Sequence, residues 1–220
     1  MYNQVKTKVK QVITFVIALC IAISTIAVYN TVNVSAKSKA KSKVKTYDTV
    51  VIGDSRIVGL AATDGIKTKN NSLEVDGCNK SKTIYYKGKV GQGYKWFNDN
   101  LSSIAKKCDK HTIVYVAFGV NDLYNVNSYK KLFNKLKDKF NGATIKIAEV
   151  GQIDEVKAKR NGYIVKQKDI DKFNKTIRKA AKNNDNYTYI DFWAGNEGKQ
   201  TVDGIHYNSD EYSATLKNLK

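Results

Sequence analysis

The chain has 220 residues, of which 42% are hydrophobic and 26% are charged, and its 38 Lys and Arg against 20 Asp and Glu give a formal net charge of +18. This length and balance suit one α/β domain with a substantial core and exclude a disordered chain. The positive charge favours anionic partners such as cell-wall polymers, anionic lipid or nucleic acid. Because the sequence contains no zinc-finger or single-strand-binding motif, we interpret the lysines as a solvated surface and predict no nucleic-acid partner.

The first 36 residues have the three-part layout of a secretory signal peptide. Lysines precede an apolar run over residues 12–28, and the small residues Val34 and Ala36 frame a cleavage site. The alternative is an uncleaved membrane anchor, because the run is only slightly shorter than a spanning helix. Cys20 does not match a lipoprotein cysteine, since no small residue precedes it. We therefore predict export to the exterior or surface of a Gram-positive bacterium, with membrane contact only through this segment before cleavage.

Residues 37–46 are predicted to form a basic linker, and residues 47–220 the folded domain. The signal segment contains three lysines and no acids, so its removal lowers the net charge from +18 to +15. Two cysteines remain, Cys78 and Cys108. One disulfide between them, worth about 3–4 kcal/mol, and two free thiols are equally open. No Cys/His spacing indicates a metal site, and we expect neither a metal nor a cofactor.

Apolar runs suited to strands alternate with amphipathic stretches from residue 46 onward. The predicted strands cover residues 49–53, 83–86, 112–118, 144–150 and 187–193. The predicted helices cover residues 57–62, 96–108, 128–140, 168–183 and 212–219. Residues 154–167 lack a clear pattern and are expected to form a loop with a turn at Asn161-Gly162. Strands that alternate with helices indicate βαβ units, hence a mainly parallel sheet whose ligands bind beyond the carboxyl ends of its strands.

The sequence Gly53-Asp54-Ser55 follows the first strand directly and leads into a helix. This order places the Ser55 hydroxyl at the carboxyl end of a strand and at a helix N-terminus. A serine there is either an attacking group or an ordinary helix N-cap. A serine nucleophile also needs a base, an acid that orients the base, and hydrogen-bond donors for the oxyanion.

Two histidines are available as a base. His111 opens a strand, far from the carboxyl ends of the strands, and is expected to be a surface residue. His206 follows the last strand, and Asp203 lies three residues before it in a tight turn. An aspartate at this spacing can hold the imidazole Nδ1 and stabilise the imidazolium. We therefore interpret His206 as a general base and Asp203 as its orienting acid; the alternative is an exposed turn without a catalytic role.

Three groups are candidates for binding an oxyanion. The backbone N–H of Ser55 begins a helix, and Asn121 follows the strongest predicted strand with a side-chain amide. A glycine N–H from Gly91 or Gly93, at the start of the next helix, is a natural third donor. The alternatives are a simple helix entry at the two glycines and a turn at Asn121-Asp122.

These blocks occur in the order found in one known family. Residues 53–55 (GDS), Gly93, residues 119–122 (GVND) and residues 203–206 (DGIH) resemble the motif blocks of the SGNH hydrolases, the superfamily that includes the GDSL-type lipases and esterases. The resemblance implies that Ser55 is the nucleophile, His206 the general base and Asp203 its acid. It implies an oxyanion hole made by the N–H groups of Ser55 and Gly93 and the side chain of Asn121. The implied fold is a flavodoxin-like three-layer α/β/α sandwich with a central, mainly parallel sheet of about five strands.

Three positions depart from the family pattern. Arg56 stands where many members have leucine, and we predict that it binds an anionic substrate; the alternative is a surface salt bridge. Tyr207 replaces a frequent proline, which signifies little in a chain without proline. The glycine block lacks its usual polar neighbours, so Gly91 stays an alternative to Gly93 as the oxyanion donor.

The resemblance and the export signal together predict a secreted serine esterase that needs no cofactor. The expected substrates are carboxylic esters with short acyl groups, such as the O-acetyl groups of an acetylated polysaccharide or peptidoglycan, and we expect a monomer. Two alternatives stay open. One is an acyltransferase that uses the same three residues, and the other is a non-catalytic surface protein that binds an anionic wall polymer.

Overall fold

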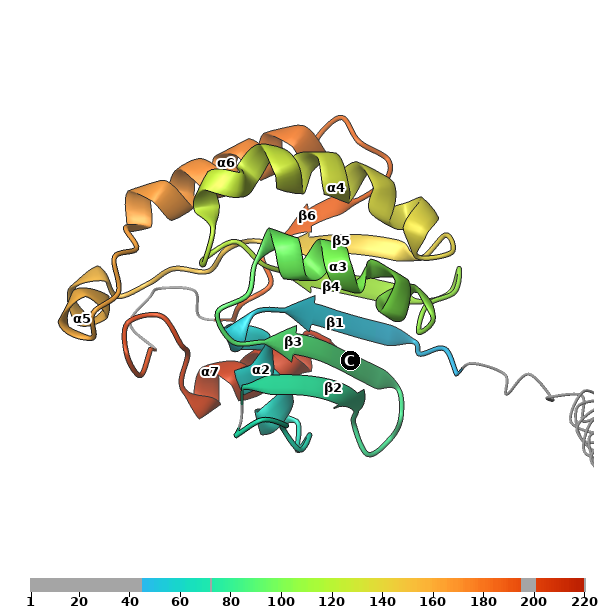
Figure 1. Ribbon diagram of the computed structural model, residues 1–220, viewed down its shortest axis with the longest axis horizontal. Helices are drawn as coiled ribbons and strands as arrows, with labels where there is room; N and C mark the ends of the chain where they lie inside the picture. Colours follow the sequence, from blue (N-terminus) through green and yellow to red (C-terminus); the bar gives the residue numbers. More distant parts are fainter. Residues whose placement is uncertain (1–44, 72, 195–200, 220) are drawn as a thin grey trace, which may run out of the picture. The chain divides into compact units, whose positions relative to one another are not determined.

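Figure 1 shows the computed structural model, which describes residues 45–71, 73–194 and 201–219. The predicted signal peptide and the predicted linker up to residue 44 lie outside the described residues. Within the described ranges, no helix is long and apolar enough to cross a membrane. Val44–Lys220 forms one unit by its internal contacts, and both hydrophobic clusters of the core consist of its residues. Both core clusters of the described residues therefore lie beyond the predicted signal peptide, so this unit contains the buried core that independent folding requires.

The centre of the fold is a six-stranded sheet in the order β2-β3-β1-β4-β5-β6. Its strands are β1 (Thr49–Gly53), β2 (Glu74–Cys78), β3 (Ile84–Lys89), β4 (Ile113–Ala117), β5 (Thr144–Ala148) and β6 (Thr188–Ile190). β1 pairs in parallel with β3 and β4, β4 with β5, and β5 with β6, whereas β2 runs antiparallel to β3 at the edge. The prediction of a mainly parallel sheet of about five strands is confirmed, with β2 as one further edge strand.

Helices cover both faces of the sheet (Figure 1). They are α2 (Ser55–Thr63), α3 (Tyr94–Ala105), α4 (Val126–Lys139), α5 (Glu155–Arg160), α6 (Gln167–Ala181) and α7 (Ser209–Lys217), with a short 3-10 helix η1 (Leu123–Asn125). Side chains of α3, α4 and α6 pack in one hydrophobic cluster with Val50 and Ile52 of β1, whereas α2 and α7 pack in another with Val51. β1 contributes to both clusters because successive side chains of a strand point to opposite faces. The predicted three-layer α/β/α sandwich is confirmed.

Three elements differ from the prediction. β2 lies in a stretch, Glu-Val-Asp-Gly-Cys, whose polar residues and glycine do not predict a strand, and it forms by pairing with β3 while Val75 is fully buried. α5 occupies part of the predicted loop over residues 154–167, because Asp154 caps it by accepting a backbone N–H of its first turn. β6 is shorter than the predicted residues 187–193, since its parallel pairing with β5 covers only three residues.

The two cysteines are both free thiols, which decides between the two alternatives left by the sequence. Cys108 is buried after α3, and burial raises the pKa of its thiol to about 12. Its thiolate is therefore not populated near neutral pH, and Cys108 serves as a core residue.

The carboxyl ends of β1 and β4 lie side by side, because Gly53 pairs with Ala117. A Cβ at Gly53 would come within 2.3 Å of the Ile57 side chain and 2.5 Å of the Ala117 carbonyl oxygen. Only glycine permits this approach, which lets α2 begin directly after β1. Ser55 consequently lies at the edge of the sheet where the other predicted site residues are also found.

Candidate active site

Asp54, and not Ser55, caps helix α2. The Asp54 carboxylate accepts a hydrogen bond from the backbone N–H of Arg56 at 3.0 Å, and Ser55 is the first residue of the helix. The alternative that Ser55 is an ordinary N-cap is therefore wrong. Because the aspartate satisfies the helix terminus, the serine hydroxyl is left to interact with other groups.

A continuous chain of hydrogen bonds joins Ser55, His206 and Asp203. Ser55 Oγ lies 2.7 Å from His206 Nε2, and His206 Nδ1 lies 2.6 Å from Asp203 Oδ2. The other oxygen of Asp203 accepts the backbone N–H groups of Ile205 at 2.9 Å and His206 at 2.8 Å. These bonds close the tight turn, in which Gly204 adopts a φ of +100°. The structure thus brings together residues that are 151 positions apart in the sequence.

The Asp203 carboxyl group is held in its ionised form. Burial alone would raise its pKa, but hydrogen bonds from the His206 backbone and side chain, the Ile205 N–H and the Tyr163 hydroxyl lower the pKa to about 2. An ionised carboxylate at Nδ1 keeps the proton on that nitrogen and leaves Nε2 facing Ser55 as the acceptor. This arrangement can remove the proton of the serine hydroxyl. The second histidine, His111, is exposed and precedes β4, at the opposite end of that strand.

Besides the Ser55 N–H, the candidate oxyanion groups come from the loops after β3 and β4, and hydrogen bonds connect these two loops. The side-chain amide of Asn121 donates to the Gln92 carbonyl oxygen at 2.8 Å, and the Asp122 carboxylate accepts the Tyr94 N–H at 2.8 Å. Gly93 lies between these two contacts as the N-cap residue of α3. One amide proton of Asn121 remains beyond its bond to Gln92, because a side-chain amide has two donors.

Gly93 and Gly91 differ in what surrounds them, and this difference gives a matched pair of variants. A Cβ at Gly93 would come within 2.3 Å of Asp122 Oδ2, whereas a Cβ at Gly91 meets nothing within 4 Å. We expect Gly93→Ala to displace Asp122 and Asn121 and to reduce ester hydrolysis about 100-fold. Gly91→Ala should cost only about 1 kcal/mol of stability, because alanine is strained at the φ of +71° that Gly91 adopts. Steady-state kinetics of both variants check this; a larger loss for Gly91→Ala would assign the donor to Gly91.

The structure contradicts both predictions for Arg56. Its side chain is only 2% exposed, so it makes no surface salt bridge. Its Nε donates to the Ile205 carbonyl at 2.9 Å, one terminal nitrogen to the Gly151 carbonyl at 3.0 Å, and the other to Gln152 at 3.3 Å. The guanidinium also stacks on the Tyr207 ring, 4.8 Å from its centre. Arg56 therefore does not bind substrate and instead connects the start of α2 to the loop that contains His206.

Tyr163 is a site residue that the sequence did not indicate. Its hydroxyl donates to Asp203 Oδ2 at 2.9 Å, and its ring packs edge-on against the His206 ring. The same segment is fixed by a close fit at Gly204, where a Cβ would come within 2.1 Å of the Ala158 nitrogen. Tyr163 follows the Asn161-Gly162 turn in the stretch predicted as a loop. No local pattern reports a contact across 40 residues, so the sequence gives no signal for it.

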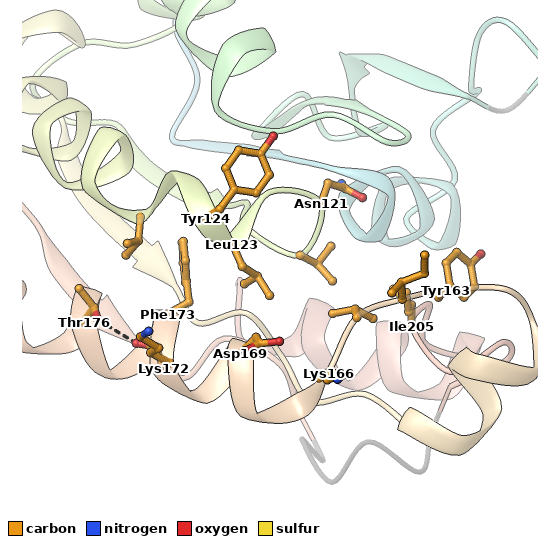
Figure 2. A pocket seen from close by; sticks show the side chains of 14 residues that line it. Asn121, Leu123, Tyr124, Tyr163, Lys166, Asp169, Lys172, Phe173, Thr176 and Ile205 are labelled. Atoms are coloured by element: carbon orange, nitrogen blue, oxygen red, sulfur yellow. Dashed lines mark hydrogen bonds between the residues drawn. The ribbon is translucent and has the colours of Figure 1, made fainter.

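A groove of about 630 Å³ begins beside this site. Figure 2 shows Tyr163 and Ile205 at one end of the groove, Phe173, Lys172 and Thr176 at the other, and Leu123 and Asp169 between the two ends. Its apolar lining includes Val120, Leu123, Val126, Val165, Phe173 and Ile205, and its polar lining from α6 includes Asp169, Lys172 and Thr176. Within the described part of the chain, no group of three or more His, Cys, Asp or Glu residues is arranged to hold a metal ion.

Asp54 makes the stability of the fold depend on pH. Burial raises its pKa to about 6 from an ordinary 3.8, against the opposing charges of Arg56 and His206. A carboxyl group with a raised folded-state pKa stabilises the fold as the pH falls from about 6 toward 4, because the folded chain then binds the extra proton. We expect Asp54→Asn, which keeps a capping side chain, to remove about 2–3 kcal/mol of this pH-dependent gain. Urea denaturation of both proteins at pH 7.5 and pH 4.5 tests this, and parallel pH profiles would contradict it.

Comparison with known proteins supports the fold. No family model and no curated protein matches the sequence. A GDSL-like lipase from Bacteroides thetaiotaomicron has a TM-score of 0.57 at 17% identity, covering 87% of this chain and 94% of its own. The lipase/acylhydrolase from Enterococcus faecalis has a TM-score of 0.53 at 16% identity, covering 78% and 94%. A carbohydrate esterase family 3 protein from Talaromyces cellulolyticus has a TM-score of 0.52 at 14% identity, covering 78% and 93%.

The chain therefore has the fold of the SGNH hydrolases, to which the GDSL-like lipases belong, as the motif blocks predicted. At this low identity the likeness establishes the architecture. The roles of the individual residues depend on the geometry described above.

Proposed function

We propose that the protein is a serine esterase that hydrolyses carboxylic esters through Ser55, His206 and Asp203. The single observation that carries this proposal is the unbroken chain of hydrogen bonds from Ser55 Oγ through the His206 ring to Asp203, at 2.7 and 2.6 Å. These distances lie within the range in which a general base removes a proton from a nucleophile. The names of the structural neighbours, which include a lipase/acylhydrolase and a carbohydrate esterase, agree with ester hydrolysis.

The reaction proceeds in two acyl-transfer steps. Ser55 Oγ attacks the ester carbonyl carbon while its proton passes to His206 Nε2. The tetrahedral oxyanion binds the N–H groups of Ser55 and Gly93 and the Asn121 amide. The bond to the alcohol oxygen then breaks, and His206 gives its proton to that oxygen. A water molecule loses a proton to His206, attacks the acyl-enzyme carbonyl and releases the acid, and the proton returns to Ser55 Oγ.

The groove suggests which half of the ester is large. The groove volume of about 630 Å³ lies within the roughly 300–1,000 Å³ typical of small-molecule sites and is larger than the volume of an acetyl group. Its apolar lining suits the faces of sugar rings, and the polar residues of α6 suit hydroxyl groups. We therefore infer that the alcohol half, a carbohydrate or wall polymer, occupies the groove and that the acyl group is short. Together with the predicted signal segment, this inference favours a secreted enzyme that removes O-acetyl groups.

An ester screen tests the proposal. Residues 37–220 are assayed with p-nitrophenyl acetate, butyrate and longer acyl esters, and with acetylated xylan and O-acetylated peptidoglycan. Ser55→Ala serves as the control for non-enzymatic hydrolysis. We expect release of acetate from at least one polymer and a decline in rate with acyl length. No turnover on any ester would favour the non-catalytic binding protein, and acetyl transfer to an added sugar in place of hydrolysis would favour the acyltransferase.

A further inference from the structure

The segment from α5 into α6, residues 156–168, exposes large apolar side chains to solvent. Ile164 is 94% exposed, Val156 64% and Tyr163 36%. Single exposed apolar residues are common and need no explanation, but a cluster on one short segment marks an interaction surface. Tyr124, which is 84% exposed, lines the same groove as Tyr163 and Ile164. The apolar surface is therefore continuous with the mouth of the groove.

The same segment is basic. It contains Lys157, Lys159, Arg160, Lys166 and Lys168, while the acidic residues Asp154, Glu155, Asp169 and Asp171 lie just outside its two ends. Lys157 donates to the Thr201 carbonyl oxygen at 2.8 Å, whereas the other four cations form no ion pair with any described carboxylate. Four cations that pair with no described carboxylate flank the most exposed aliphatic side chain of the described chain.

The fold holds this segment in place. Gly162 adopts a φ of +83°, the N–H of Tyr163 donates to the Ala158 carbonyl at 3.0 Å, and the Tyr163 hydroxyl binds Asp203. Figure 1 shows α5 beyond the carboxyl ends of the strands, at the edge of the sheet that contains the candidate active site. These contacts fix the backbone around Ile164 in an exposed position. Because the surface is preorganised, it loses little conformational entropy on binding.

We propose that residues 156–168 dock the protein on the surface of an anionic lipid bilayer, which replaces the expectation that membrane contact is limited to the signal segment. Ile164 and Val156 enter the boundary between headgroups and acyl chains, and Lys159, Arg160, Lys166 and Lys168 contact anionic headgroups. A soluble polyanion offers no apolar phase in which a projecting aliphatic side chain could be buried, and single-stranded nucleic acid is bound through aromatic stacking platforms. An anionic bilayer can bind both the cations and the apolar side chains of the segment. This inference does not rest on the proposed esterase activity.

Tryptophan substitutions at two exposed apolar positions test the insertion. Ile164→Trp and Leu73→Trp are made in residues 37–220; Leu73 is 51% exposed and lies just before β2, so it is a matched control. Vesicles of phosphatidylcholine with and without phosphatidylglycerol are added to each protein. We expect a blue shift of emission and quenching by brominated lipid only for Ile164→Trp and only with phosphatidylglycerol. Equal responses of the two variants, or no response of either, would overturn the proposal.

Charge variants test the role of the cations by vesicle co-sedimentation. Lys159→Gln/Lys168→Gln is compared with Lys135→Gln/Lys139→Gln in α4, which removes the same charge elsewhere. We expect the first pair to weaken binding about 25-fold, at about fivefold per lysine, and the control pair to change it less than about threefold. Equal losses would indicate non-specific attraction and would refute docking through this segment. Loss of dextran sulfate or single-stranded DNA binding with unchanged vesicle binding would assign the segment to a soluble polyanion instead. p-Nitrophenyl acetate hydrolysis, measured in parallel, is expected to be unchanged.

Discussion

Replacing Ser55 with alanine is expected to reduce the rate of ester hydrolysis on the order of 10⁴- to 10⁶-fold while leaving the fold intact. The alanine removes only Oγ, which lies 2.7 Å from His206 Nε2, and Asp54 continues to cap the helix. Alanine is also the best helix former, so its place at the start of α2 costs no stability. The measurement is kcat/KM with the most active ester from the screen, together with the melting temperature.

Combining Ser55→Ala with His206→Ala tests whether the two residues act as one unit. His206→Ala alone should cost about as much activity as Ser55→Ala, and the double variant should be no worse than either, because residues that act as one unit are not additive. Ser102→Ala on the exposed side of α3 is the matched control and should leave activity unchanged. Multiplied losses in the double variant, or an active Ser55→Ala protein, would show that the two groups do not share one proton transfer.

Arg56→Met is expected to lower the free energy of unfolding by about 3–5 kcal/mol. The guanidinium is 2% exposed and satisfies the carbonyl oxygens of Ile205, Gly151 and Gln152. Methionine keeps much of the side-chain volume but supplies no donor, so these carbonyl groups lose their partner in a low-dielectric surrounding. Denaturation in urea at pH 7.5 measures the loss.

The same substitution is expected to reduce kcat more than it changes KM, since Arg56 holds the residue next to His206 and has no place in the groove. Arg178→Met is the matched control: its guanidinium pairs with Asp191 at 3.1 Å, with both side chains more than half exposed. Such an exposed pair contributes only about 0–1 kcal/mol. Equal destabilisation by the two variants would mean that the buried carbonyl contacts of Arg56 contribute nothing specific.

Local patterns in the sequence were sufficient for most of the sheet. The predicted bounds of β1 agree with the structure, because a run of β-branched residues favours a strand and the Gly-Asp-Ser that follows ends it. β4 and β5 were predicted for the same reason. β2 was missed because its sequence contains no apolar alternation, and only the neighbouring β3 makes it a strand. α5 was missed because six residues with three basic side chains show no helical pattern; Asp154 and the fit against Gly204 stabilise it.

The residues of the candidate site likewise divide into those that local sequence patterns predicted and those that depend on packing. The sequence by itself determined the residue types and their places after the strands of a parallel sheet, and parallel strands bring their carboxyl ends to one edge whatever the details of packing. This argument predicted Ser55, Asn121, Asp203 and His206 as neighbours. It had no means of assigning Arg56, because the exposure of a side chain depends on which distant segments cover it.

Only the tertiary structure decided that Arg56 binds carbonyl groups up to 149 positions away and that Tyr163 supports Asp203. The physical reason is common to both. A hydrogen bond of a buried polar group is set by whichever donor or acceptor the packing brings within about 3 Å, and sequence periodicity contains no information about that partner.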